Sequence, residues 1–283
     1  MEYREFGKTG FSASLIGMGT YYDPFWIVLA YLFGIRLHGK RSILALKIGL
    51  DSGINLIDTA EIYQTEPLVA EVIKGRKRDE LFIASKVWLN HLHYDAVLRA
   101  CDRSLRRLGT SYLDLYQIHV PNKGVPIKET MRAMEKLVED GKIRHIGISN
   151  FSLKQVLDAE NALSRQELVS TQMHYNLLHR GIERDILDHC EAENIAILAY
   201  FPLAHGKLAG NKMRSTLAYR EISSKHPGRT PSQVALNWLC TKSEAVFPIP
   251  RGSNPQHVEE NLSAVGWNLD QSDMELLNQA FPA

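Results

Sequence analysis

The sequence predicts an α/β protein built as a (β/α)8 TIM barrel, because short apolar runs alternate with helix-patterned segments along most of its 283 residues. No linker rich in Gly, Pro or Ser interrupts this series, and barrels commonly use about 250 residues. We therefore expect one barrel domain over residues 1–283. Its strands are predicted at 15–19, 54–58, 81–86, 113–119, 143–149, 168–172, 195–200 and 245–249.

An N-terminal β-hairpin is expected before the first barrel strand. Residues 3–6 and 12–15 would form its two strands, on either side of the turn Gly7-Lys8-Thr9-Gly10.

Glycines and a threonine–proline pair indicate where several helices begin and end. Gly53, Gly109 and Gly141 each follow a helical run, at the position where a left-handed helix end favours glycine. Thr230-Pro231 predicts a helix start, with a capping side chain and proline in the first turn.

The main alternative fold is an open doubly wound sheet, whose first strand–helix turn carries G-x-G-x-x-G. Here Gly17-Met18-Gly19 is followed by Thr20-Tyr21-Tyr22, without a third glycine and without a helix directly after it. The barrel is therefore preferred.

The composition is that of an ordinary globular protein, with 45% hydrophobic and 23% charged residues. A net charge of +1 does not indicate a nucleic-acid partner. Cys101, Cys190 and Cys240 lie far apart without C-x-x-C spacing, so we expect buried thiols in a reducing compartment. The charged N-terminus does not resemble a signal peptide, and we expect a cytoplasmic location.

Four ionisable side chains stand at or just beyond the ends of three predicted strands. Asp58 and Tyr63 follow the second strand, Lys86 ends the third, and His119 ends the fourth. The C-terminal ends of barrel strands form one rim, where the active sites of this fold lie. A phenol can donate a proton, an ammonium would lower its pKa, a carboxylate would hold the ammonium, and an imidazole would orient a carbonyl oxygen. The four groups predict acid–base chemistry on a carbonyl.

In this order, the motifs resemble those of the aldo-keto reductase superfamily from about residue 1 to 277, with an interruption at 24–37. The resemblance implies a pyridine-nucleotide oxidoreductase whose catalytic tetrad is Asp58, Tyr63, Lys86 and His119. The motifs are Asp58-Thr59-Ala60-Glu61-Ile62-Tyr63, Ala84-Ser85-Lys86-Val87-Trp88 and Tyr116-Gln117-Ile118-His119-Val120-Pro121.

The resemblance also implies a cofactor site on the same rim. Ser149, Asn150 and Gln172 would bind the nicotinamide carboxamide, and Tyr200 would stack on its ring. Arg251, after the eighth strand, would meet a 2′-phosphate. The other implied cofactor-binding positions are Gly19, Thr20, Tyr21, Asp58, Leu203, Gly252, Ser253 and His257, together with Glu260 and Asn261, which would face the adenine.

Two positions depart from the family pattern. His257 stands where many NADP-preferring members have arginine, and Phe201 stands where many have serine. We expect NADP(H) as the preferred cofactor, with NAD(H) as an alternative.

The substrate site is expected at Tyr21, Trp88 and His119. Val120 occupies a position where many members carry tryptophan, so this wall of the pocket would be more open. The spacing of His91 and His93 could suit a metal, but no third ligand is evident at matching spacing, and we expect no metal.

The most apolar part of the chain is residues 24–37, with Arg36 as its single charge. It is shorter than the ~20 apolar residues that a membrane span needs, so no span is expected. One hypothesis is that its aromatic residues roof the pocket and favour an apolar carbonyl substrate. The equally weighted alternative is a short helix packed against the barrel or a partner subunit. The aromatic residues are Phe25, Trp26, Tyr31 and Phe33.

The function expected from the sequence is NAD(P)H-dependent reduction of small aldehydes or ketones, reversible as alcohol oxidation, with Tyr63 as proton donor. The alternative is a cofactor-binding regulatory or sensor subunit with little turnover that binds a partner through residues 24–37. The oligomeric state and the physiological substrate stay open.

Overall fold

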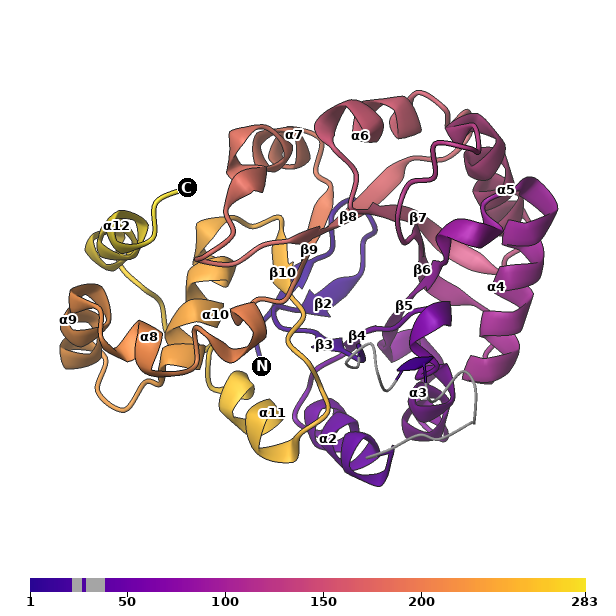
Figure 1. Cartoon of the computed structure of the whole chain (residues 1–283). Helices are drawn as coiled ribbons and strands as arrows, with labels where there is room; N and C mark the ends of the chain where they lie inside the picture. The colour runs from indigo at the N-terminus through magenta and orange to yellow at the C-terminus, as the bar shows by residue number, and fades with distance from the viewer. Residues whose placement is uncertain (22–26, 29–38) are drawn as a thin grey trace.

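Eight parallel strands form the centre of the computed structural model, which describes residues 1–21, 27–28 and 39–283. The strands follow one another around the barrel in chain order, and Figure 1 shows them in a ring with helices outside. The predicted (β/α)8 class is confirmed. The strands are β3 (Met18–Gly19), β4 (Leu56–Asp58), β5 (Phe82–Val87), β6 (Leu113–Ile118), β7 (Ile143–Ser149), β8 (Leu168–His174), β9 (Ala196–Tyr200) and β10 (Val246–Pro248).

Hydrogen bonds between the first and last strands close the barrel. Gly17 N donates to Pro248 O at 3.0 Å, and Gly19 N donates to Pro250 O at 2.9 Å. Proline has no backbone N–H, so at these two positions the bonds can run only from the β3 side. Strands β3 and β10 are shorter than the predicted strands 15–19 and 245–249.

Strand β8 ends two residues beyond its predicted end at 172. Met173 and His174 pair with Ala199 and Tyr200, so the two strands reach the rim together. The extension places His174 beside Tyr200 on the catalytic side of the barrel.

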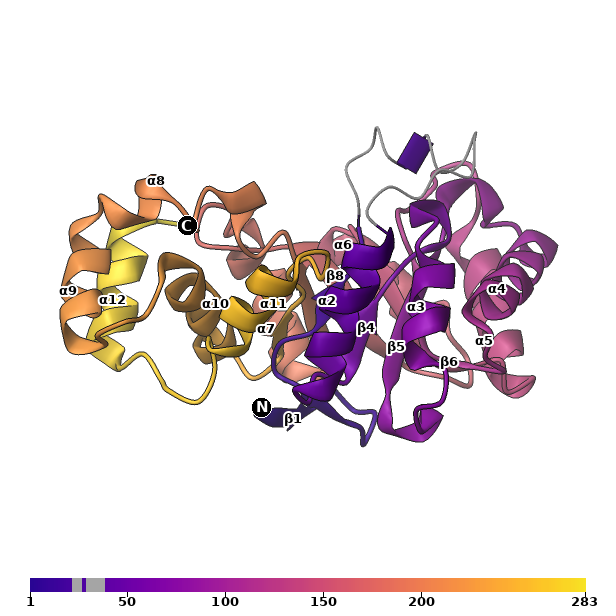
Figure 2. The same ribbon diagram turned by 90° about the horizontal axis from the view of Figure 1, so that it is seen from below.

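The predicted N-terminal hairpin is present and covers the bottom of the barrel. Its strands, β1 (Tyr3–Glu5) and β2 (Ser12–Ser14), are antiparallel and lie at the lower end of the barrel in Figure 2. The fully buried Phe6 ring lies 4.6 Å from the Phe82 ring and 4.9 Å from the Phe247 ring. This apolar cluster fills the barrel at the end opposite the predicted active site.

The predicted caps are found at one end of α2, α4, α5 and α10. Gly53, Gly109 and Gly141 have φ angles of 94°, 63° and 68°, the left-handed geometry expected at helix ends. Thr230 accepts a hydrogen bond from Gln233 N at the start of α10. The surrounding helices are α2 (Gly39–Asp51), α3 (Glu66–Ile73), α4 (Tyr94–Leu108), α5 (Ile127–Glu139), α6 (Leu153–Glu160), α7 (Ile186–Ala192), α10 (Pro231–Lys242) and α11 (Pro255–Leu262).

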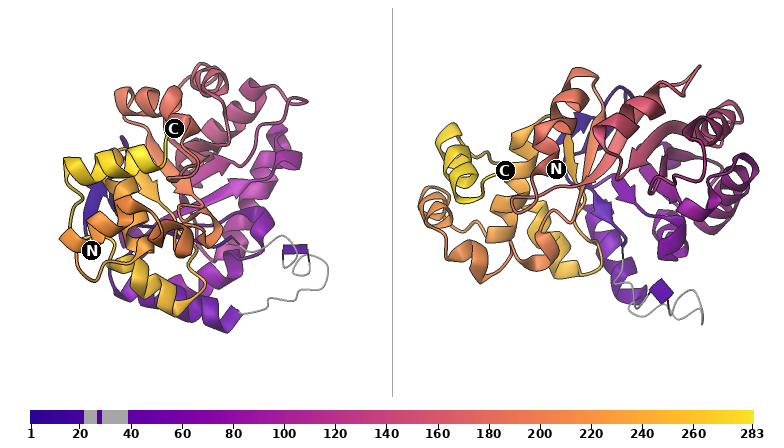
Figure 3. Two further views of the ribbon diagram at one scale, coloured as in Figure 1. Left: turned by 60° about the vertical axis from the view of Figure 1, so that its left-hand side comes forward. Right: turned by 45° about the horizontal axis from the view of Figure 1, so that its top comes forward.

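Additional short helices follow β9 and end the chain. In Figure 3, the orange α9 and the yellow α12 lie side by side at the outer edge of the molecule. Lys225 and His226 of this region contact Asp273 at 2.7 and 2.9 Å. These helices are α8 (Asn211–Arg214), α9 (Leu217–Lys225) and α12 (Gln271–Ala280), and the 3-10 turns are η1 (Glu61–Tyr63), η2 (Arg78–Glu80), η3 (Leu89–His91), η4 (Gly181–Arg184) and η5 (Ala204–Gly206).

The apolar segment 24–37 falls almost entirely outside the described residues, and so do all four aromatic residues of the roof hypothesis. Of this segment, only residues 27–28 are described, and Val28 is exposed. Among the described helices, none is both long and apolar enough to cross a membrane.

Candidate active site

The four predicted catalytic side chains meet at the C-terminal rim of the barrel. Asp58 ends β4, Lys86 lies at the end of β5, and His119 directly follows β6. Tyr63 lies on η1, the turn that leaves β4. All four are buried, with exposed fractions of 9% or less.

Asp58 and Lys86 form a buried ion pair beneath the rim. Lys86 Nζ lies 2.6 Å from Asp58 Oδ2 and donates a second hydrogen bond to Thr59 O at 2.8 Å. Burial lowers the pKa of Lys86, whereas the Asp58 carboxylate opposes that shift. Asp58 therefore holds the ammonium in place and favours its charged form.

Tyr63 and His119 face each other across the site, with the Tyr63 hydroxyl 3.3 Å from His119 Nε2. Burial is the main cause that raises the pKa of Tyr63 well above its usual value, and the Asp58 charge adds to it. The net shift of this pKa is upward, although the sequence suggested a value lowered by Lys86: Lys86 Nζ lies 5.0 Å from the centre of the Tyr63 ring, and its charge is paired with Asp58. The phenol therefore keeps its proton.

His119 is a neutral imidazole. Burial lowers its pKa to about 2, and the positive charge of Lys86 contributes to this shift. In the described part of the chain, its buried Nδ1 has no hydrogen-bond partner. Nε2 is thus the ring nitrogen that faces Tyr63 and the space where a carbonyl oxygen would bind.

The residues predicted to bind nicotinamide form one hydrogen-bonded group. Tyr200 donates from its hydroxyl to Asn150 Oδ1 at 2.7 Å, and Asn150 Nδ2 donates to His119 O at 3.0 Å. Ser149 Oγ donates to Gln172 O at 3.0 Å. Asn150 adopts a left-handed φ of 64°, which asparagine tolerates better than most residues. This group connects the predicted ring-stacking tyrosine, Tyr200, to the backbone of His119, the predicted catalytic histidine.

Aromatic rings surround the tetrad, including those of Tyr21 and Trp88 from the predicted substrate site. The Trp88 ring meets His119 edge-on at 5.1 Å, and the Tyr21 ring meets Tyr63 edge-on at 5.2 Å. Phe201 lies 5.5 Å from Tyr21 and 5.1 Å from Tyr200. An apolar wall therefore faces the acid–base groups.

Gly19 and Thr20 lie where the barrel closes. A Cβ atom on Gly19 would lie 3.0 Å from Ile249 O, so the close strand contact favours glycine. Thr20 Oγ1 is 2.8 Å from Thr65 Oγ1, which ties the end of β3 to the turn after η1. Both residues lie near Asp58, because Thr20 N donates to Asp58 O at 2.9 Å.

A pocket of about 270 Å³ lies between α2 and α11, which run next to each other in Figure 1. Arg251, Ser253 and His257 were predicted from the sequence, whereas Arg41 and Asn254 were missed. Gly252 connects this loop to the end of β3, because its N–H donates to Gly19 O at 2.8 Å. The residues that line the pocket are Arg41, Arg251, Ser253, Asn254 and His257.

The predicted cofactor residues Leu203, Glu260 and Asn261 are not among the residues that line this pocket. Glu260 accepts a hydrogen bond from Thr230 Oγ1 at 2.6 Å, at the cap of α10. Asn261 is buried, and Leu203 is partly buried against the core. Their contacts with a cofactor stay predictions.

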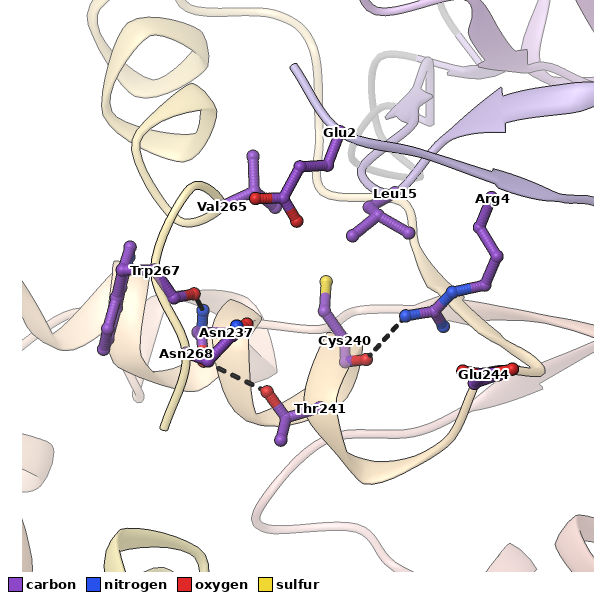
Figure 4. Close-up of a pocket in the computed structure, with 10 residues that line it drawn as sticks. All are labelled: Glu2, Arg4, Leu15, Asn237, Cys240, Thr241, Glu244, Val265, Trp267 and Asn268. Carbon is purple, nitrogen blue, oxygen red and sulfur yellow. Dashed lines mark hydrogen bonds between the residues drawn. The ribbon is translucent and has the colours of Figure 1, made fainter. Parts of the chain in front are cut away.

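A different pocket, which is not lined by any tetrad residue, lies at the hairpin end of the barrel (Figure 4). Arg4 donates there to Cys240 O at 3.2 Å, and Glu2 accepts from Gly266 N at 2.8 Å. Burial raises the pKa of the Cys240 thiol to about 12, so the thiol is unreactive. These contacts tie the hairpin to α10 and the segment before α12.

Both histidines considered for a metal pair with carboxylates instead. His91 Nδ1 lies 2.5 Å from Glu61 Oε1, and His93 Nδ1 lies 3.2 Å from Glu129 Oε1. Among the residues that the structure describes, no group of three or more His, Cys, Asp or Glu side chains could hold a metal ion.

The sequence model of the Aldo/keto reductase family matches residues 37–281. The chain belongs to this family. Methylglyoxal reductase YeaE of Escherichia coli is a relative in the family, 34% identical over 247 residues that cover 86% of each chain.

Solved aldo-keto reductase structures superpose closely on this chain. The thermostable aldo-keto reductase Tm1743, in complex with the inhibitor epalrestat, has a TM-score of 0.87 and 36% identity, and 99% of each chain is covered. An aldo-keto reductase from Klebsiella pneumoniae, in complex with NADP and acetate, has a TM-score of 0.85 and 32% identity. That comparison covers 99% of this chain and 95% of the Klebsiella protein.

Proposed function

We propose that the chain is an NAD(P)H-dependent oxidoreductase that reduces aldehydes or ketones and oxidises alcohols in the reverse direction. The observation that carries this proposal is the buried group in which a protonated Tyr63 faces a neutral His119 above the Lys86–Asp58 pair. We assign this function to residues 1–283 as a single domain.

In the proposed reaction, the reduced nicotinamide supplies a hydride to the carbonyl carbon. His119 orients the carbonyl oxygen, and Tyr63 gives that oxygen its hydroxyl proton, so the product is an alcohol. The resulting phenolate carries negative charge, and the nearby Lys86 ammonium stabilises that charge. Lys86 thus acts mainly after proton transfer begins, which agrees with a raised pKa of Tyr63 in the resting site.

The pocket between α2 and α11 fits the phosphate part of a dinucleotide. Among the described residues, its lining combines two guanidinium groups, an imidazole, a hydroxyl and an amide, without a carboxylate. Guanidinium forks suit phosphate oxygens, and a 2′-phosphate distinguishes NADP(H) from NAD(H). We therefore propose NADP(H) as the preferred cofactor and NAD(H) as the weaker one. Arg41 would add a second guanidinium where His257 replaces the family arginine.

The proposed substrates are small carbonyl compounds. The relative named methylglyoxal reductase supports a reactive aldehyde of low mass, and the aromatic wall around Tyr63 and Trp88 supports an apolar group beside the carbonyl. The three free, buried cysteines agree with the proposed cytoplasmic location.

Fluorescence titration with NADPH and NADH, followed by turnover of methylglyoxal and benzaldehyde, tests the function. We expect tight NADPH binding, weaker NADH binding and loss of nicotinamide absorbance with at least one aldehyde. Tight NADPH binding without turnover of any carbonyl compound would instead favour the sensor subunit. Absence of binding to either nucleotide would reject both functions.

A further inference from the structure

Glu61 links the turn of the proton donor to the loop that carries the substrate wall. It lies on η1, two residues before Tyr63, and is 7% exposed. Its Oε2 accepts a hydrogen bond from Trp88 N at 3.2 Å, while its Oε1 lies 2.5 Å from His91 Nδ1. A single carboxylate therefore contacts the loop after β5 at two points.

The charge of this carboxylate is compensated from a third element. Arg103, on α4, has its guanidinium 3.6 Å from Glu61 Oε1 and 3.5 Å from His91 Nδ1. A buried carboxylate is costly unless it is hydrogen-bonded and paired. Glu61 meets both conditions, so its position is well defined, although the proposed proton transfer does not use its charge.

The contacts of Glu61 complete a ring of residues around the proposed reaction site, in which each residue contacts the next. The Trp88 ring packs edge-on against His119 at 5.1 Å, and the His119 ring packs edge-on against Tyr63 at 5.3 Å. Tyr63 is linked to Glu61 through the backbone of η1, and Glu61 contacts Trp88 by accepting the hydrogen bond from its backbone N–H. A shift of any member therefore moves the gap between the proton donor and the wall.

We propose that Glu61 is a positioning residue for carbonyl reduction, which holds Trp88 at a fixed distance from Tyr63 with the help of His91 and Arg103. The role rests on the proposed function of Tyr63 and Trp88. It predicts that Glu61 controls the binding of substrates whose side group reaches Trp88 and matters less for the smallest substrates.

The His93–Glu129 pair offers a matched control. It also joins a histidine and a glutamate, at 3.2 Å, and Glu129 also accepts a backbone N–H, from Tyr94 at 2.9 Å. It connects the start of α4 to α5 and contacts neither Tyr63 nor Trp88. Glu129→Ala therefore removes the same kind of interaction without touching the rim.

Hydrogen exchange at the Trp88 amide tests the contact without reference to catalysis. Glu61→Ala removes the acceptor of that N–H, so exchange should be about tenfold faster or more, whereas Glu61→Gln keeps an acceptor and should change it little. Glu129→Ala should leave Trp88 exchange unchanged. Equal exchange in Glu61→Ala and the parent protein would overturn the proposal.

Kinetics test the positioning role. In Glu61→Ala, KM for benzaldehyde should rise about tenfold, whereas KM for methylglyoxal, kcat and the Kd of NADPH should stay within about twofold. Equal effects on both aldehydes, or effects matched by Glu129→Ala, would overturn it. His91→Ala keeps the Glu61 carboxylate and removes one of its contacts. It replaces Glu61→Ala if that variant does not fold, and KM for benzaldehyde should again rise. If the parent protein reduces no carbonyl, the proposed function fails, while Trp88 exchange still decides the contact.

Discussion

Gln172 donates a hydrogen bond from its side-chain amide to Asp58 Oδ1 at 2.8 Å, across the barrel from β8 to β4. Lys86 occupies the other carboxylate oxygen at 2.6 Å, so both oxygens of Asp58 are engaged. Gln172 was predicted to contact the nicotinamide. In the structure, this side chain holds the carboxylate that pairs with Lys86.

Replacement of Gln172 by leucine should therefore affect two properties together. We expect weaker NADPH binding, because the predicted carboxamide contact is lost, and a free energy of unfolding lower by about 1–3 kcal/mol, because a buried carboxylate loses a donor. Fluorescence titration and thermal unfolding measure the two effects.

Gln117→Leu is the matched control, because Gln117 donates to the same Asp58 oxygen at a longer distance of 3.4 Å. It should destabilise less and leave NADPH binding nearly unchanged. Equal NADPH affinities in the two leucine variants would contradict the dual role of Gln172.

Tyr63→Phe should abolish most turnover while leaving the fold and the cofactor site intact. Loss of a positioned proton donor typically costs about 10²–10⁴ in rate. We expect a fall of this size in kcat for aldehyde reduction, with the Kd of NADPH changed less than about twofold. Tyr21→Phe removes a neighbouring hydroxyl and should retain most activity. Comparable losses in both variants would show that Tyr63 has no special role.

Much of the site could be predicted from the chain because barrel strands all deliver their ends to one rim. Asp58, Lys86 and His119 stand at recognisable strand ends, so their meeting follows from the fold. Burial depends on everything packed around a side chain and is not evident from a motif. For that reason the sequence suggested a Tyr63 pKa lowered by Lys86, whereas in the folded protein burial outweighs that effect and raises the pKa.

Arg41 illustrates a second limit. Arg41 comes from the start of α2 and reaches the pocket only because barrel closure brings α2 against α11. No spacing or periodicity marks such a neighbour in the sequence. Glu61 and His91 were likewise separate features until the turn and the loop were placed together.

The neutral state of His119 predicts a pH dependence of stability. Its pKa is about 2 in the folded protein, against an ordinary value of 6.5, so below pH 6.5 the unfolded chain binds a proton that the native site refuses. The free energy of unfolding that depends on neutral His119 is therefore fully present above pH 6.5 and is lost progressively as the pH falls toward 2. Through His119 alone, the free energy of unfolding should fall by about 1.4 kcal/mol for each pH unit in this range.

His119→Gln should flatten the pH dependence of unfolding by that slope, measured by chemical denaturation at several acidic pH values. In the parent enzyme, kcat/KM should also show no inflection from His119 between about pH 5 and 8. An inflection near pH 6.5 that disappears in His119→Gln would show that the imidazole titrates normally.

Cofactor preference should depend on both guanidinium groups of the pocket between α2 and α11. Because the 2′-phosphate is absent from NADH, Arg41→Ala and Arg251→Ala should each raise the Kd of NADPH about tenfold or more, while changing the Kd of NADH about twofold or less. Added salt should weaken NADPH binding more strongly in the parent than in either variant, since surface charges are screened. Lys212→Ala, on α8, removes a positive charge outside the pocket lining and serves as the control. If Arg41→Ala leaves the ratio of the two Kd values unchanged, Arg251 recognises the phosphate without help from α2.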